Sequence, residues 1–101
     1  MALDLYSLEN GRIGEHLLSI EDEMFRNLVR CFTIVQKRSG IKVDEYGELK
    51  LPWRSYGVIL DVIKEARLMS QNKDEIAALG KLEAVLLELD RRQSGVIFVG
   101  D

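Results

Sequence analysis

The first residues alternate apolar and polar positions in two short runs, which predicts a β-hairpin. In LDLYSLENGRIGEHLL these runs flank Asn10-Gly11, a pair that tolerates the positive φ angles of a tight type I′ turn. Gly14 weakens the second arm, because glycine has no side chain to pack in a strand. We therefore expect the chain to begin with two paired strands.

A second alternating stretch, IKVDEYGELKL, predicts another hairpin. Its turn should lie near residues 45–47. Its two arms should bring four apolar side chains together: Ile41, Val43, Leu49 and Leu51. Pro52 ends the pairing, because it has no N–H to donate to a neighbouring strand.

Between the hairpins, apolar residues recur with the period of a helix from about residue 20 to Ser39. Ser19, followed three residues later by Asp22, resembles a capping box, and Gly40 suits the position just after the helix. The main apolar arc comprises Met24, Leu28, Cys31, Phe32 and Val35, widened by Phe25 and Val29. So wide an arc predicts a central helix that is covered on more than one side.

Two further helices follow the second hairpin. Ser55 is the expected cap of a helix that runs to about Met69. Its buried face should hold Tyr56, Ile59, Leu60, Val62, Ile63, Ala66 and Met69. Asn72, with Glu75 three residues later, should begin a third helix that ends near Gln93. The main apolar arc of this helix is Ala78, Leu79, Leu82, Val85, Leu86 and Leu89.

The third helix also carries a second, weaker apolar stripe on its other side. The stripe consists of Ile76, Ala77, Gly80, Ala84 and Leu87. Its small residues allow another backbone to approach closely, which would offset the cost of a glycine inside a helix. Two interpretations stay open: packing against the second helix of the same chain, or an apolar surface that binds a partner or forms a homodimer.

The last residues, GVIFVGD, include four consecutive apolar positions and predict a strand that is buried on both faces. The fold class is therefore α+β. We expect three helices packed on a small, mostly antiparallel sheet made of two hairpins and the C-terminal strand. Residues 1–101 should form a single domain, with 47% apolar and 31% charged residues.

Charge and targeting patterns limit the functions that this domain can have. The 14 basic and 17 acidic residues give a net charge of −3, which disfavours nucleic-acid binding because affinity for phosphates comes from clustered Lys and Arg. The sequence has no apolar run long enough to span a membrane and no signal-peptide pattern at its N-terminus. Together with a single cysteine, these features predict a cytoplasmic protein.

The sequence offers few groups for catalysis, and we expect no enzyme activity. His16 is the only imidazole, and Cys31 lies in the apolar arc of a helix, where burial makes a thiol inert. One His and one Cys cannot form a zinc site, and DEYGELK lacks the ligand spacing of an EF-hand. Phosphate-loop, dinucleotide-binding and nucleophile-elbow motifs are absent from the sequence. We therefore expect neither a metal nor a cofactor.

Three acids surround Tyr46 in the turn of the second predicted hairpin: Asp44, Glu45 and Glu48. This turn is either a solvated hairpin tip or a patch that contacts a partner. On the first helix, Arg26, Arg30 and Lys37 share a face that is either solvated or RNA-binding. The lack of aromatic residues on that face favours the first interpretation.

The chain opens with LDLYSLENGRI and carries EDEMFRNLVRCF as its central helix. In this general plan of a short acidic domain without catalytic groups, it resembles bacterial immunity proteins, which bind and neutralise cognate polymorphic or contact-dependent toxins. The resemblance implies a protein that blocks a toxin, commonly a nuclease, by binding its active-site region. Exposed acids would suit this role, because nucleases present basic clefts to their substrates.

We therefore predict a partner-binding site made of exposed acids near aromatic residues. The predicted residues are Glu21, Glu23, Asp44, Glu45, Tyr46, Glu48 and Trp53. Trp53 can equally belong to the core. The main alternative function is a structural or regulatory subunit that homo-oligomerises through the third helix, and a further alternative is an RNA-binding adaptor.

Overall fold

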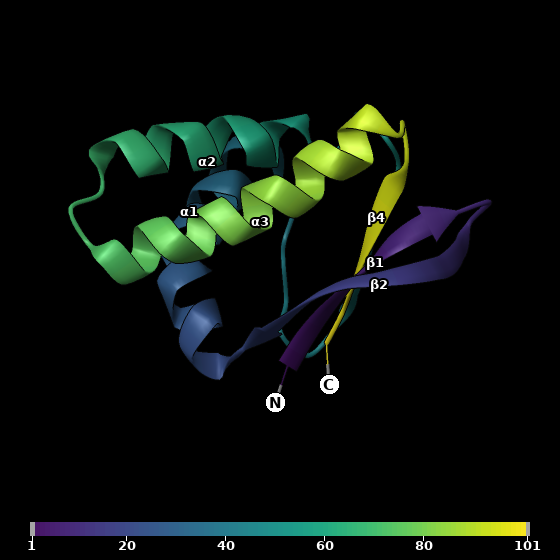
Figure 1. Ribbon diagram of the computed structural model, residues 1–101, viewed down its shortest axis with the longest axis horizontal. Helices are drawn as coiled ribbons and strands as arrows, with labels where there is room; N and C mark the ends of the chain where they lie inside the picture. Colours follow the sequence, from purple (N-terminus) through teal and green to yellow (C-terminus); the bar gives the residue numbers. More distant parts are fainter. Residues whose placement is uncertain (1, 101) are drawn as a thin grey trace.

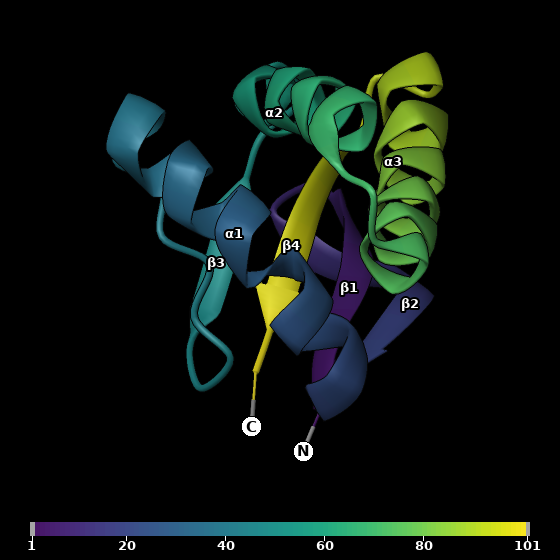
Figure 2. The same cartoon turned by 90° about the vertical axis from the view of Figure 1, so that its left-hand side faces the viewer.

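The computed structural model describes residues 2–100. A layer of three helices covers one face of a four-stranded antiparallel sheet with strand order β2-β1-β4-β3 (Figures 1 and 2). The elements, in chain order, are β1 (Ala2–Glu9), β2 (Arg12–Glu21), α1 (Asp22–Ser39), β3 (Glu48–Leu51), α2 (Gly57–Met69), α3 (Lys73–Arg91) and β4 (Gly95–Val99). The predicted α+β class, with three helices on a small antiparallel sheet, is confirmed.

The first hairpin and the C-terminal strand form as predicted. Asn10 and Gly11 both have positive φ angles, 53° and 76°, as a type I′ turn requires. Strand β4 lies between β1 and β3, and its residues from Gly95 to Phe98 are buried. The run of four apolar residues therefore marks a central strand of the sheet.

The second predicted hairpin is wrong. Residues 41–43 form no strand, and β3 pairs instead with β4, with Leu49 opposite Phe98. Val43 is still buried, because its side chain enters the core from an irregular segment. The alternating pattern therefore reflected burial of single side chains rather than a ladder of backbone hydrogen bonds.

Helix α1 ends as predicted but begins differently. Gly40 has a φ of 80°, and its N–H donates to the Gln36 carbonyl over 2.8 Å. Ser19 does not cap the helix, because β2 continues through Glu21 and the Ser19 hydroxyl donates to Asp4 across the hairpin over 2.6 Å. Glu21 occupies the N-cap position and makes no side-chain capping bond there.

Two predictions for helix α2, its cap and the position of Met69, are wrong. It begins at Gly57 with Tyr56 at its N-cap, and Ser55 makes no capping bond. Tyr56 is buried, and its hydroxyl donates to the Ser94 carbonyl over 2.6 Å. Met69 is not on the buried face: it is 80% exposed, because the last turn of the helix extends beyond the core.

Helix α3 begins as predicted and ends two residues early. The Asn72 side chain accepts from the backbone N–H groups of Asp74 and Glu75, over 2.9 and 3.1 Å. The helix ends at Arg91, because Gln93 adopts a left-handed φ of 56° and turns the chain towards β4.

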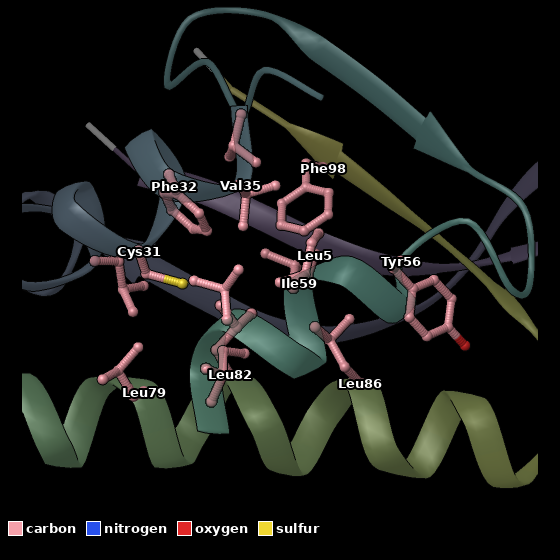
Figure 3. Packing of buried hydrophobic residues seen from close by; sticks show 14 of the residues in the cluster. Leu5, Cys31, Phe32, Val35, Tyr56, Ile59, Leu79, Leu82, Leu86 and Phe98 are labelled. Atoms are coloured by element: carbon pink, nitrogen blue, oxygen red, sulfur yellow. The ribbon is translucent and has the colours of Figure 1, made fainter. Parts of the chain in front are cut away.

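The core lies between the sheet and the helices (Figure 3). Side chains from all three helices meet the inner face of the sheet, where Leu5 and Phe98 lie. Cys31 is 2% exposed in this cluster, and burial, followed by the charge of Glu75, raises the pKa of its thiol to about 11. The thiol therefore packs as a small apolar group, as predicted.

Most of the second apolar stripe of α3 faces outward, whereas Ile76 lines a groove together with Leu68 of α2. A Cβ built at Gly80 would have no atom within 4 Å outside its own helix, and Leu87 is 45% exposed. Packing of this stripe against the second helix is therefore limited to its edge at Ile76. No helix among residues 2–100 combines the length and the apolar character needed to cross a membrane.

Candidate functional site

Six of the seven predicted partner-binding residues lie at one end of the sheet, which we call the acidic end. They are Glu21, Glu23, Asp44, Glu45, Tyr46 and Glu48. Glu21 lies opposite Ala2 on one side of the sheet, and Glu48 lies opposite Val99 on the other. Both ends of the described chain are found here as well (Figure 1). The antiparallel sheet thus brings together residues that are up to 27 positions apart in the sequence.

A tight turn presents the central part of the acidic end. The Asp44 side chain accepts from the Tyr46 N–H over 2.9 Å, and its carbonyl accepts from the Gly47 N–H over 3.2 Å. Gly100 then ties the turn to the end of β4, because its N–H donates to the Gly47 carbonyl over 2.7 Å. The turn is therefore fixed to the sheet while Tyr46, which is 61% exposed, projects into solvent.

Glu45 connects this turn to the start of α1. Together with Asp22 and Phe25 it lines a small depression next to the first residues of β1. The depression therefore joins the turn to the β2–α1 junction, where Glu21 and Glu23 flank Asp22.

A groove of about 360 Å³ extends the acidic end along the helices. Glu21 and Glu23 line one wall, and Asp74 at the start of α3 lines the other. Met24 and Ala77 contribute apolar surface between them. Sequence reasoning missed Asp74, because no local pattern indicates that the start of α3 lies beside the start of α1.

The acids of this end differ from other surface acids in having few cationic neighbours. Elsewhere, ion pairs join Arg30 to Glu75, Arg38 to Glu65, Arg67 to Glu83, Arg91 to Glu88 and Arg92 to Glu15. Within residues 2–100, no Lys or Arg lies within 4.0 Å of the carboxylates of Glu21, Glu23, Asp44 or Glu45. Glu48 has only Lys50, at 3.8 Å. The acidic end thus presents negative charge that the described fold does not neutralise.

Trp53 does not belong to this surface. It follows the far end of β3 and lies with the Asn10-Gly11 turn and Gln93 around another groove. Its indole N–H donates to Asp90 over 2.9 Å, and the guanidinium of Arg54 lies 4.5 Å above its ring. We call this opposite end of the sheet the Trp53 end.

A cluster of Asp4, His16 and Ser19 lies on the face of the sheet that no helix covers. His16 Nε2 is 3.0 Å from Asp4 Oδ1 and 3.1 Å from the Ser19 hydroxyl. The bonds from Ser19 and then His16 lower the pKa of Asp4. A catalytic triad would need the serine and the carboxylate on opposite nitrogens of the imidazole, whereas here one nitrogen faces both. The cluster therefore joins β1 to β2 and has no triad geometry.

Comparison with protein-family models, with curated proteins and with solved structures finds no significant match. The acidic end therefore has to be interpreted from its own geometry.

The remaining sequence candidates show no convergent geometry. Among residues 2–100, no three His, Cys, Asp or Glu side chains gather in a way that could hold a metal ion. Cys31 is buried in the core, whereas His16 is on the uncovered face of the sheet. Arg30, from the basic face of α1, is paired with Glu75 over 2.7 Å, which reduces the positive charge available to a phosphate backbone.

Proposed function

We propose that this chain is a protein-binding inhibitor of the immunity type that acts in the cytoplasm. It would neutralise a cognate bacterial toxin, such as a nuclease, by covering the toxin's active-site region with the acidic end. It would need no cofactor and would catalyse no reaction, because occupation of a basic cleft is enough to block it.

The observation that carries this proposal is the concentration of unneutralised acids at one end of a fold in which five carboxylates elsewhere are paired with arginine. Exposed like charges on one surface repel each other, and within residues 2–100 the five predicted acids gain only the Glu48–Lys50 pair in return. A basic partner surface would relieve this repulsion and would be attracted over a distance of about 8–10 Å at physiological salt.

The groove beside Glu23 adds a place for a side chain of the partner. Three carboxylates and the apolar side chains of Met24 and Ala77 line it together with one base, Lys81. This predominantly acidic lining matches a Lys or Arg side chain, which has a charged head and an apolar stem. Tyr46 supplies an exposed aromatic group, a residue type that is enriched among interface residues with large binding contributions.

The test is co-expression with the toxin. If a gene next to that of this protein encodes a large secreted protein with a variable C-terminal domain, that domain is expressed alone and together with this chain. We expect growth to be restored only with this chain, and a stable complex on size exclusion. Unchanged toxicity with no complex would rule the proposal out.

A charge variant and a matched control locate the binding surface. The acid-neutral variant carries Glu21→Gln, Glu23→Gln, Asp44→Asn, Glu45→Gln and Glu48→Gln. The control variant removes the same number of charges elsewhere, through Glu9→Gln, Glu15→Gln, Asp61→Asn, Glu65→Gln and Glu88→Gln. We expect the first to lose protection and the second to retain it. Equal protection by both would exclude the acidic end as the binding surface.

A further inference from the structure

Strand β2 leaves one of its two backbone edges unpaired. It pairs only with β1 and forms one side of the sheet, below α3 (Figure 2). In an antiparallel pair, alternate residues direct both their N–H and their C=O away from the neighbouring strand. Within residues 2–100, the backbone of residues 12–19 bonds only to β1, which includes the bond from the Glu15 N–H to the Ser7 hydroxyl. The outer edge of β2 is therefore free to pair with another strand.

Only part of this edge is regular. From Leu18 to Glu21, four consecutive residues face β1 in one register, whereas the register shifts twice between Ile13 and Leu18. Register shifts of this kind bend a strand and interrupt its pairing. The regular part is as long as β3, which pairs with β4 over four residues. It is therefore long enough to hold a short added strand.

The groove of about 360 Å³ runs beside this regular edge. Ser19, which lines it, lies on the face of the sheet that no helix covers, where its hydroxyl donates to Asp4. Met24 and Ala77, which also line it, belong to the helix layer on the other face. A groove that touches residues from both sides of the sheet passes along the edge of β2. It therefore leaves space at the position that a fifth strand would occupy.

The charges around the groove select the chemistry of such a strand. The carboxylates of Glu21, Glu23 and Asp74 line the groove, and the one base among its lining residues is Lys81. A basic segment would be attracted to this lining and an acidic segment would be repelled. We propose that the partner adds an extended segment with Lys or Arg side chains to the edge of β2, as a fifth strand of the sheet. This inference rests on the proposed function, because it specifies how a basic partner engages the acidic end.

The two faces of the added strand would meet different surroundings, because alternate side chains of a strand point to opposite faces. On the helix side they would meet the wall formed by Ala77 and Ala78, whose short side chains leave room for apolar residues. On the uncovered side they would lie next to Ser19 and Glu21, which are two positions apart in β2. The expected segment therefore alternates apolar residues with Lys or Arg.

Peptide binding tests the proposal without a toxin. The probe is a fluorescently labelled eight-residue peptide that alternates valine and lysine, titrated with the whole chain at low salt and followed by fluorescence anisotropy. We expect saturable binding, which a peptide that alternates valine and glutamate should not show. Ala77→Trp should weaken binding at least tenfold, because the indole would fill the groove. Ala84→Trp is the matched control, since Ala84 is exposed on the same helix and does not line the groove, and it should bind like the natural chain.

Amide hydrogen exchange, measured by NMR, shows whether the peptide joins the sheet. In the free chain, alternate N–H groups from Leu18 to Glu21 should exchange rapidly, because they face outward. In the complex with the valine–lysine peptide, these N–H groups should be protected as well. Binding by charge alone would leave their exchange unchanged.

Four results would overturn the proposal. The first is no binding of the valine–lysine peptide at millimolar concentration, and the second is binding that leaves the outward N–H groups unprotected. The third is equal binding by Ala77→Trp and Ala84→Trp. The fourth is a free chain in which these N–H groups are already protected and which sediments at twice 11.5 kDa, because the edge would then pair with a second copy.

The failure of this inference is distinguishable from the failure of the proposed function. A toxin domain that is bound and neutralised while the outward N–H groups of β2 stay unprotected would overturn the added strand alone. Protection by the peptide, together with unchanged toxicity and no toxin complex, would overturn the proposed function alone.

Discussion

The two ends of the same sheet differ in whether their polar and charged side chains have bonding partners within the fold. At the Trp53 end, the indole of Trp53 donates to Asp90, Glu88 accepts from Arg91, and Tyr56 is bonded to the Ser94 carbonyl. At the acidic end, the carboxylates of Glu21, Glu23, Asp44 and Glu45 have no Lys or Arg within 4.0 Å among residues 2–100, and Glu48 has only Lys50.

This difference separates residues that maintain the fold from residues that are available for binding. Contacts at the Trp53 end connect the segment before α2 to the end of α3 and to Ser94 after it, so their removal should lower the free energy of unfolding. Charges at the acidic end make few contacts within residues 2–100, so their removal should change binding and leave the fold intact. The predictions below test this separation, beginning with the largest expected effect on stability.

Gly95→Ala should be the most destabilising of these changes. A Cβ at this position would lie 2.7 Å from the Leu51 carbonyl oxygen and 3.2 Å from the Cα of Pro52, so the backbone of the Trp53 end would have to shift. We expect a loss of about 2–3 kcal/mol in the free energy of unfolding, measured by urea denaturation. Gly57→Ala is the control, because its Cβ would meet no atom within 4 Å. Equal losses in both variants would contradict the assignment of tight packing to this end.

Tyr56→Phe should cost about 1–2 kcal/mol at neutral pH, because it leaves the carbonyl of the half-buried Ser94 without this hydrogen bond. Burial, and then the charge of Asp90, raises the pKa of Tyr56 to about 12. The folded state therefore holds the phenolic proton more tightly than the unfolded state. Its contribution to stability is complete below about pH 10 and is lost as the pH rises towards 12.

The measurement for Tyr56 is the free energy of unfolding between pH 7 and 12. Tyr56→Phe should remove part of the decline that the natural chain shows above pH 10. Tyr46→Phe, at the exposed tyrosine of the acidic end, should leave both the stability and its pH dependence unchanged. A Tyr46 variant that behaves like the Tyr56 variant would contradict the separation of the two ends.

The acid-neutral variant should have the smallest effect on stability, within about 0.5 kcal/mol of the natural chain at moderate salt. At low salt it should be the more stable of the two, because the repulsion among its acids has been removed. The check is urea denaturation of both proteins at low and high ionic strength. A marked loss of stability would show that these carboxylates maintain the fold.

Local signals were sufficient to predict much of the fold. The Asn10-Gly11 turn, the Asn72 cap and Gly40 depend on backbone geometry that neighbouring residues determine, and all three are found as predicted. The wrong predictions concern positions whose structure depends on residues that are distant in the sequence. The Ser19 hydroxyl is occupied by Asp4, and β3 pairs with β4, which is far away in the sequence.

The candidate site likewise combines features that the local sequence predicts with features that depend on distant parts of the chain. The acids before α1 and in the turn after it were visible as charged runs, but their approach depends on the strand order of the sheet. Trp53 was included because tryptophan is frequent among interface residues with large binding contributions, but β3 carries it to the other end of the sheet. Asp74 was missed because the groove that contains it is formed by two helices that are distant in sequence.

The most direct test of the central claim is the rate of association with the cognate toxin domain, measured by stopped-flow fluorescence at increasing salt. If the acidic end attracts a basic partner, the association rate constant of the natural chain should fall steeply with ionic strength. The acid-neutral variant should associate slowly and with almost no salt dependence, and the control variant should keep most of the natural rate and its slope. A natural chain whose association rate does not depend on salt, or an acid-neutral variant that associates equally fast, would contradict the account.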